Sequence, residues 1–283
     1  MSLPKIDAHH HFWRYTPDEY DWIDDSMSSL RRDFLPDDLL RQIQASGING
    51  VISVQARQTV DETRWLLDLA SAHDFIQGVV GWIPLTDPNL RNVLNSLRQN
   101  VKLKGVRHVL QGEPDERYIL RDDFNRGIDL LKEWELVYDI LVYERHLPHV
   151  IEFVQRHPEQ VFVVDHIAKP RIREGVLSPW REHITRLAEF PNVYCKLSGM
   201  VTEANHQAWK EQDLQPYFDE VLNAFSPYRL LFGSDWPVCL AATSYQSWLS
   251  MVQKQIATLT ESEQSAVLGG VAAQVYRLSR LEQ

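Results

Sequence analysis

The chain contains 283 residues, of which 44% are hydrophobic and 24% are charged, and its formal net charge is −10. The acidic balance and the lack of a Lys/Arg cluster argue against a nucleic-acid partner, and no apolar run approaches the roughly 20 residues that span a bilayer, so no membrane partner is expected. The first residues lack the pattern of a signal peptide, and we therefore expect a cytoplasmic chain whose two cysteines, Cys195 and Cys239, are reduced and structural.

Apolar segments of strand length alternate with amphipathic segments of helix length along the whole chain. Strands are expected at 3–11, 50–55, 77–84, 105–110, 136–142, 161–165, 193–197 and 230–233, and helices at 36–47, 61–73, 87–99, 122–135, 148–156, 178–190, 217–225, 244–256 and 261–278. Mostly apolar strands are typical of parallel strands buried on both faces. Eight strand and helix units predict a single-domain (β/α)8 TIM barrel over residues 1–283.

The first connection distinguishes this barrel from its main rival. A doubly wound open sheet normally has a Gly-rich turn after its first strand, and the sequence has none there. Residues 14–34 instead form a long polar segment with several aromatic residues, which is too long for a tight turn. Since such a loop follows a barrel strand, we expect it to cover the active site, with a merely decorative loop as the alternative.

Three strand ends carry side chains that can bind a metal or transfer protons. His9 and His11 alternate along the first strand, so both point to one face while His10 points to the other. His166 follows the sixth strand and Asp235 follows the eighth. Because the carboxyl ends of barrel strands meet at one face, we expect His9, His11, His166 and Asp235 to form one site. A hydrogen-bonded buried histidine and a helix-capping aspartate are the alternatives for single members.

These residue types fit the hydrolysis of an ester or lactone, which needs a water nucleophile, a base and a group that stabilises an oxyanion. We assign Asp235 as the general base and expect partial burial beside Trp236 to raise its pKa. The histidines can polarise the carbonyl by holding one Zn²⁺ ion, with Asp235 completing the ligand set, or by donating hydrogen bonds directly. The residues leave these two alternatives open.

Further side chains near strand ends are candidates for substrate contacts. Arg107 is a candidate clamp for a carboxylate or hydroxyl group, and Lys196 is a weaker one. A structural ion pair is the alternative for both. Aromatic and hydroxyl groups that can form the wall of a sugar site are those of Trp13, Trp82, Tyr143 and Trp236.

Several motifs resemble those of the amidohydrolase superfamily: Asp-x-His-x-His at 7–11, Asp-His at 165–166 and Gly-Ser-Asp-Trp-Pro at 233–237. With Lys-Gly-Val-Arg-His at 104–108 and Lys-Leu-Ser-Gly at 196–199, they are similar to the amidohydrolase-2 type lactonases related to L-fuconolactonase and L-rhamnonolactonase. The resemblance extends over nearly the whole chain. It implies that a small sugar lactone, an L-fuconolactone-like aldonolactone, is opened to the sugar acid.

Departures from the wider superfamily bear on the metal. Two-metal members carry a bridging lysine at the end of the fourth strand, whereas Lys104 precedes that strand here, and the fifth strand ends at 142–144 without a histidine. The resemblance therefore implies at most one divalent ion, with zinc as the expected metal, and does not decide whether activity requires it. The alternatives are an amidohydrolase-2 type decarboxylase, a hydrolase of a dicarboxylic pyrone-type lactone, and a noncatalytic sugar or metal binder.

Overall fold

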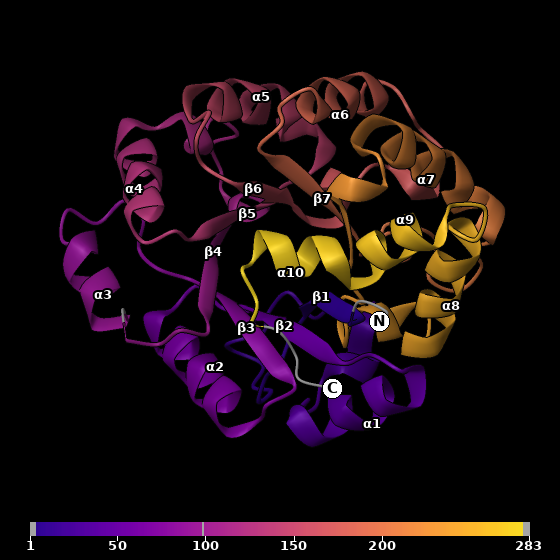
Figure 1. The fold of residues 1–283 in the computed structure, drawn as a ribbon, viewed down its shortest axis with the longest axis horizontal. Helices are drawn as coiled ribbons and strands as arrows, with labels where there is room; N and C mark the ends of the chain where they lie inside the picture. The colour runs from indigo at the N-terminus through magenta and orange to yellow at the C-terminus, as the bar shows by residue number, and fades with distance from the viewer. Residues whose placement is uncertain (1–3, 98, 280–283) are drawn as a thin grey trace.

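Eight parallel strands form one sheet whose strands neighbour one another in chain order. The computed structural model describes residues 4–97 and 99–279, so the ends of the predicted 1–283 domain lie outside the described residues. Figure 1 shows the strands inside a ring of helices, which confirms the predicted (β/α)8 barrel. The strands are β1 (Ile6–His10), β2 (Gly50–Val54), β3 (Ile76–Gly81), β4 (Leu103–Val109), β5 (Val137–Leu141), β6 (Phe162–Val164), β7 (Val193–Leu197) and β8 (Leu230–Phe232).

The helices of the outer ring follow the strands in the predicted order. These helices are α1 (Pro36–Ser46), α2 (Val60–Ala72), α3 (Leu90–Leu97), α4 (Asp122–Glu133), α5 (Leu147–Arg156), α6 (Trp180–Ala188), α7 (Glu211–Phe225) and α8 (Tyr245–Gln255). Arg98, within the range predicted for the third helix, lies outside the described residues. Each described helix is too short or too polar to span a membrane.

The barrel closes through the residues that follow β8. His10 pairs in parallel with Trp236, and the His11 N–H donates to the Trp236 carbonyl at 2.7 Å. The Asp235 N–H donates to the His9 carbonyl at 2.8 Å. Closure of the barrel therefore places the segment that carries Asp235 directly beside the histidines of β1.

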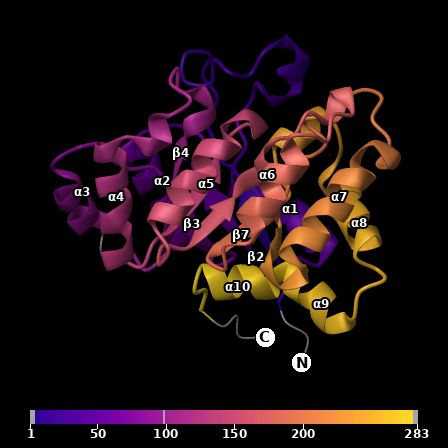
Figure 2. The same ribbon diagram turned by 90° about the horizontal axis from the view of Figure 1, so that it is seen from above.

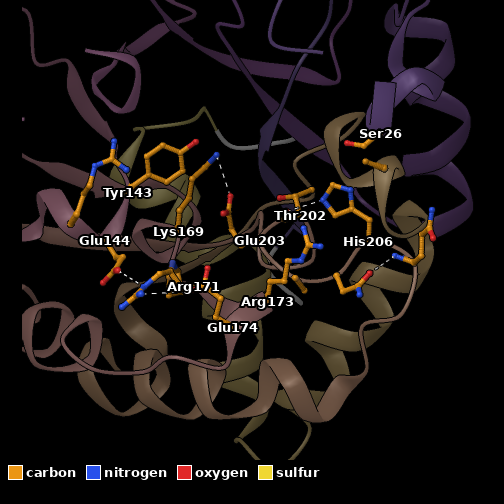
Figure 3. A pocket seen from close by; sticks show the side chains of 16 residues that line it. Ser26, Tyr143, Glu144, Lys169, Arg171, Arg173, Glu174, Thr202, Glu203 and His206 are labelled. Carbon is orange, nitrogen blue, oxygen red and sulfur yellow. Dashed lines mark hydrogen bonds and ion pairs between the residues drawn. The ribbon is translucent and has the colours of Figure 1, made fainter. Parts of the chain in front are cut away.

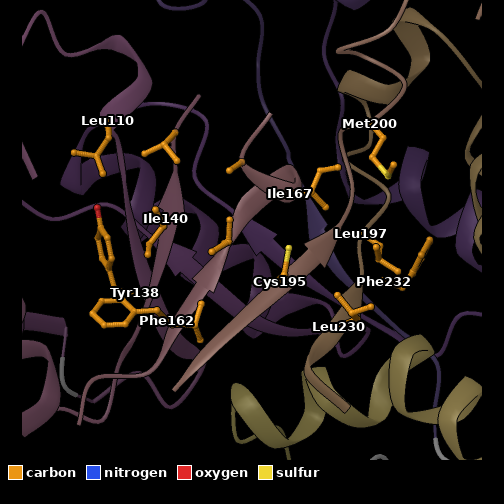
Figure 4. Close-up of a cluster of buried hydrophobic side chains, with 14 of the residues drawn as sticks. Leu110, Tyr138, Ile140, Phe162, Ile167, Cys195, Leu197, Met200, Leu230 and Phe232 are labelled. Atoms are coloured by element: carbon orange, nitrogen blue, oxygen red, sulfur yellow. The ribbon is translucent and has the colours of Figure 1, made fainter. Parts of the chain in front are cut away.

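Apolar side chains pack on both sides of the barrel wall, outside it against the helices and inside it between the strands. Outward-facing side chains pack under the helices, and Figure 4 shows Tyr138, Phe162, Cys195 and Phe232 among them. Both cysteines are buried and free, as predicted. Inside, small and branched side chains from the strands fill one end of the barrel, including those of Ala8, Ile52, Val54, Val163 and Leu231.

The C-terminal segment closes that end of the barrel. The segment predicted to be helical over 261–278 is helical to Val275, but it is not one regular helix, because a π-helical turn, η9 (Ala266–Gly270), separates α9 (Glu261–Ser265) from α10 (Val271–Val275). A Cβ on Gly269 would lie 2.1 Å from the Pro4 carbonyl oxygen. The backbone at Gly269 therefore lies too close to the backbone at Pro4 for any residue with a side chain. Figure 2 shows α10 below the strands, at the end opposite to the indigo segment that connects β1 to α1.

One other boundary differs clearly from its prediction. Helix α7 begins at Glu211, before Pro216, whereas the predicted helix began at Tyr217. The Asp213 carboxylate accepts the Lys210 backbone N–H at 2.8 Å and caps the longer helix. Pro216 therefore lies in the interior of the helix, where its missing N–H leaves one backbone hydrogen bond unmade.

Candidate active site

Three imidazoles from two strands converge at the carboxyl ends of the strands. Nε2 of His9 lies 3.2 Å from Nε2 of His11, and the ring centre of His166 lies 4.4 Å from that of His9. His10 points the other way, where its Nε2 lies 2.9 Å from the Ser53 hydroxyl. The strand alternation predicted from the sequence is therefore confirmed for these three neighbouring histidines.

Asp235 brings a carboxylate to the same point. Its Oδ1 lies 3.4 Å from Nε2 of His11, 3.7 Å from Nε2 of His9 and 3.9 Å from Nε2 of His166. The residue is buried and has a positive φ of 56°, which turns the chain sharply after β8. The four residues predicted to form one site are thus brought together by the barrel.

His166 is presented by a left-handed turn at the end of β6. His166, Ile167, Ala168 and Lys169 have φ values of 53°, 48°, 61° and 48°, a conformation that costs free energy for residues with a Cβ. The indole N–H of Trp180 donates to the Ile167 carbonyl at 2.8 Å and helps to hold the turn. The tight turn brings Nε2 of His166 toward Asp235.

Gly199 provides the space that the His166 ring needs. It has a φ of 64°, and a Cβ at this position would lie 2.5 Å from Nδ1 of His166. The neighbouring Ser198 hydroxyl lies 2.8 Å from the same Nδ1. The residues that follow β7 therefore determine both the position and the hydrogen bonding of this imidazole.

The donor set fits one zinc ion. Ligand atoms at the corners of a tetrahedral site with bonds of about 2.05 Å are separated by about 3.3 Å, close to the 3.2 to 3.7 Å separations among His9, His11 and Asp235. Nδ1 of His11 lies 2.9 Å from the Val54 carbonyl and must donate to it, which leaves the lone pair on Nε2. His9, His11 and Asp235 form one possible ligand group, and His9, Asp165 and His166 form a second that overlaps it.

Burial and neighbouring charges set the protonation of the cluster. Burial lowers the pKa of His9 well below its ordinary value and that of His166 to about 4. Burial opposes ionisation of Asp235, but His166, His11 and His9 outweigh it and lower the pKa of this carboxyl. The expectation of a raised pKa for Asp235 was therefore wrong. The hydrogen bond with His11, together with attraction to the imidazoles when they are protonated, favours the carboxylate.

Arg107 and Lys196 lie beneath the cluster in buried ion pairs. Nη1 of Arg107 lies 2.9 Å from Oδ2 of Asp165, and its other nitrogens bond to Gln55. Lys196 is fully buried and pairs with Asp139 and with Asp165, the latter at 3.0 Å. The clamp predicted for both cations is therefore corrected to the alternative of a structural ion pair, because Asp165 and Gln55 occupy the donors of Arg107, and Asp139 and Asp165 pair with Lys196.

The aromatic residues predicted to form a wall of the substrate site lie in different places: two tryptophans are buried in the core and one is partly exposed. Trp13 is 0% exposed, packs against Phe34 and donates its indole N–H to the Arg32 carbonyl at 2.9 Å, which corrects its predicted contact with substrate to a packing role. Trp236 is also buried and packs edge-on against Phe34. Trp82 stays partly exposed, although its N–H donates to Nδ1 of His108 at 3.2 Å.

A cavity of about 860 Å³ is lined mainly by the segments that follow β5, β6 and β7. Figure 3 shows Lys169 pointing into it between Tyr143 and Glu203. Nζ of Lys169 lies 3.4 Å from Oε1 of Glu203 and 5.5 Å from the ring centre of Tyr143. Lys169 follows His166 in the same left-handed turn, so the cavity lies beside the cluster, although none of the four cluster residues lines it.

Three side chains near the cluster were not predicted. Lys169 occurs in the Asp-His-Ile-Ala-Lys-Pro motif, but nothing local indicates that it faces a cavity. Asp139 interrupts the buried strand β5, and a lone charge within an apolar strand was the available signal. Tyr276 lies at the end of a distant helix, and its contact with Asp139 depends entirely on the closure of the barrel.

The chain is similar over nearly its whole length to curated lactonases and to a solved amidohydrolase. A curated L-fucono-1,5-lactonase from Burkholderia multivorans is 44% identical over 98% of this chain and 97% of its own length. Another from Burkholderia ambifaria is 36% identical over 98% of this chain and 96% of its own length. A crystal structure of a Burkholderia multivorans amidohydrolase with bound zinc has a TM-score of 0.95 and 42% identity, covering 98% of this chain and 100% of that one.

The family assignment extends across the barrel. The family model described as amidohydrolase matches residues 6–278, which include every strand and all four residues of the cluster. The motifs that suggested the resemblance are the segments that position the cluster at the ends of β1, β6 and β8. The chain therefore belongs to the amidohydrolase family.

Proposed function

We propose that this protein hydrolyses L-fucono-1,5-lactone, or a closely related aldonolactone, to the sugar acid. The observation that carries the proposal is the convergence of His9, His11, His166 and Asp235 on one point. The 44% identity to a curated L-fucono-1,5-lactonase over nearly the whole chain supports the choice of substrate. The function would be that of a lactonase, in which water opens the ester of the ring.

Asp235 acts as the base in this mechanism. Its carboxylate takes a proton from water while the water oxygen forms a bond to the carbonyl carbon of the lactone. The imidazoles and the positive potential around them stabilise the negative charge that develops on the carbonyl oxygen. The bond between that carbon and the ring oxygen then breaks, and the ring oxygen receives the proton held by Asp235. The products are the carboxylic acid and the freed hydroxyl group of one sugar acid.

His9, His11, His166 and Asp235 would hold a zinc ion in this site. When bound, the ion would polarise the carbonyl and lower the pKa of water. The low pKa of Asp235 makes it a weak base toward ordinary water, so positive charge near the nucleophile is needed for efficient transfer. A related Burkholderia multivorans amidohydrolase structure contains bound zinc, which supports the proposal of a metal in this chain.

A neutral polyol suits the site better than a dicarboxylate. Arg107 and Lys196 are already paired with buried aspartates, and at the cavity rim Lys169 pairs with Glu203 and Arg171 pairs with Glu144. A planar dicarboxylate would need several free cations. We propose instead that Tyr143, Lys169 and Trp82 contact the hydroxyl groups and the face of a sugar ring.

We also propose that residues 14–34 cover the substrate. Trp13 and Phe34 form an antiparallel bridge at the base of the segment, and Glu19 pairs with Arg57 at its middle. Ser26, in the short helix η1 (Asp25–Leu30), reaches the cavity rim. A segment held at these points can exclude water from the site while substrate is bound.

The proposal is tested by following acid release from purified protein in weakly buffered indicator. We expect L-fucono-1,5-lactone and related L-galactono-lactones to be hydrolysed with a higher kcat/KM than a pyrone dicarboxylic lactone. A preference for the dicarboxylate would overturn the substrate assignment. Release of CO₂ from a hydroxybenzoate, without hydrolysis of any lactone, would instead identify a decarboxylase.

A further inference from the structure

A chain of buried polar contacts connects His9 to the end of the barrel that the C-terminal segment closes. The Tyr276 hydroxyl lies 2.8 and 2.9 Å from the two carboxylate oxygens of Asp139. Asp139 pairs with the ammonium group of Lys196, and Nζ of Lys196 lies 3.3 Å from Nδ1 of His9. All four side chains are buried. The segment that closes one end of the barrel thus reaches, through two residues, an imidazole of the site at the other end.

These contacts determine where the ammonium group of Lys196 lies. An ammonium group has three N–H donors, and three acceptors surround this one: Asp139, Oδ1 of Asp165 at 3.0 Å, and Nδ1 of His9. Nζ also lies 5.6 Å from the ring centre of Tyr276. Because the side chain is fully buried, water offers no alternative partner, and a change in any one acceptor moves or redirects the ammonium group.

The position of Lys196 matters because it competes for one nitrogen of His9. Nδ1 of His9 lies 3.3 Å from Nζ of Lys196 and 3.3 Å from Oδ1 of Asp165. The ammonium group can only donate, and the carboxylate can only accept. A neutral His9 therefore either accepts from Lys196, with its proton on Nε2, or donates to Asp165, with a lone pair on Nε2. Nε2 is the atom that faces His11 and Asp235, and Nη1 of Arg107 lies 3.4 Å from it. Because the guanidinium can only donate, it favours the lone pair on Nε2.

We propose that Tyr276 is a positioning residue that acts through Asp139 and Lys196 to set the tautomer and orientation of His9. Removing its hydroxyl leaves Asp139 with Lys196 as its main partner, and this shifts the ammonium group relative to His9. The inference deepens the proposed function and rests on it for the kinetic readout. The C-terminal segment then has two roles, since it closes the barrel and supports the chemistry.

The test is Tyr276→Phe, which keeps the ring and its packing but removes the hydroxyl. We expect kcat for L-fucono-1,5-lactone to fall about tenfold, the usual effect of a residue that orients a catalytic histidine, while KM stays within about twofold. Tyr138→Phe is the matched control, because Tyr138 lies next to Asp139 on β5 and is as buried as Tyr276, but packs outward against Phe124 and Phe153. We expect its kcat to match the wild type.

A spectroscopic measurement separates positioning from loss of stability. The ¹⁵N shifts of the imidazole nitrogens of His9 distinguish its tautomers, and we expect them to change in Tyr276→Phe protein but not in Tyr138→Phe protein. A double-mutant cycle with Asp139→Asn tests whether Tyr276 acts through Asp139. If it does, the Tyr276→Phe, Asp139→Asn double variant should have the same kcat as Asp139→Asn alone. Additive losses would overturn this route.

The outcomes distinguish this inference from the proposed function. Wild-type kcat together with unchanged His9 signals in folded Tyr276→Phe protein would overturn the positioning role. If the wild-type protein hydrolyses no lactone, the proposed function fails. The imidazole spectra, recorded without substrate, still decide in that case whether Tyr276 sets the state of His9.

Discussion

The carboxylate of Asp7 accepts a hydrogen bond of 2.8 Å from the backbone N–H of Ser234, which lies 227 positions later in the chain. The same oxygen accepts the His9 N–H at 3.1 Å, and the other oxygen accepts the Tyr245 hydroxyl at 3.0 Å. These bonds join β1 to the segment that follows β8. Asp7 therefore holds His9 and Asp235 in one place without facing the site itself.

Replacing Asp7 with alanine should destabilise the fold. The change leaves up to three buried donors without an acceptor, at about 1–3 kcal/mol each, so we expect the free energy of unfolding to fall by about 3 kcal/mol or more. Asp7→Asn keeps an acceptor oxygen and should lose less than half as much. Urea unfolding followed by circular dichroism measures both. Equal losses in the two variants would show that the acceptor oxygen is not what matters.

Asp235→Asn should abolish most lactone hydrolysis while leaving the protein folded. The amide keeps the size of the side chain but cannot take a proton, and we expect kcat to fall at least about 100-fold. Asp61→Asn, at an exposed acid in the first turn of α2, is the control and should retain full activity. Steady-state kinetics with L-fucono-1,5-lactone tests this, and near-normal turnover of folded Asp235→Asn protein would refute the assignment of the base.

Zinc should bind as a single ion per chain. The two candidate ligand groups share His9, and the nearby Lys196 is paired with Asp139 and Asp165. We expect His11→Gln to weaken zinc binding about 10- to 100-fold and His149→Gln, on α5, to leave it unchanged. Metal analysis after dialysis and calorimetric titration measure this. Two tightly held ions per chain would contradict the single site.

Glu62 should make stability depend on pH. Its buried carboxylate accepts backbone N–H groups of Ala56 and Arg57, at 3.1 and 2.8 Å. Burial raises its pKa from 4.5 to about 7, although these hydrogen bonds oppose the shift. Because the folded protein holds this proton more tightly than the unfolded chain, the stabilisation is complete below pH 4.5 and is lost as the pH rises through about 7.

Glu62→Gln should remove this dependence. The amide can still accept a backbone N–H and carries no charge, so we expect the variant to be more stable than the wild type at pH 8 by up to about 3 kcal/mol. Glu261→Gln changes an exposed acid at the start of α9 and serves as the control. Unfolding free energies at pH 5 and pH 8 provide the comparison. A variant whose stability follows the wild-type pH profile would exclude Glu62 as the source.

The left-handed turn after β6 should tolerate glycine at Ala168. A Cβ in this conformation costs about 1–2 kcal/mol, which glycine avoids, so we expect Ala168→Gly to leave the free energy of unfolding unchanged or higher. Ala70→Gly, at an equally buried position within α2, should lose about 1 kcal/mol. Thermal unfolding compares the two. The same loss at both positions would argue against strain in the turn.

Much of the barrel and the members of the site could be predicted because their signals are local. Apolar strands and amphipathic helices each have a short period, and their alternation indicated eight units in the correct order. Alternation along β1 likewise placed His9 and His11 on one side and His10 on the other. The rule that parallel strands bring their carboxyl ends to one face then joined these histidines to His166 and Asp235.

The tertiary structure decided what surrounds those residues. Whether Arg107 and Lys196 meet a substrate or a buried carboxylate depends on which side chains neighbouring strands point into the barrel, and the register of eight strands sets this. The break at Gly269 arises from a backbone more than 260 positions earlier. The pKa of Asp235 likewise follows from three imidazoles brought to it by chain closure. Local patterns carry none of this information, because burial and charge pairing are properties of segments that meet only after folding.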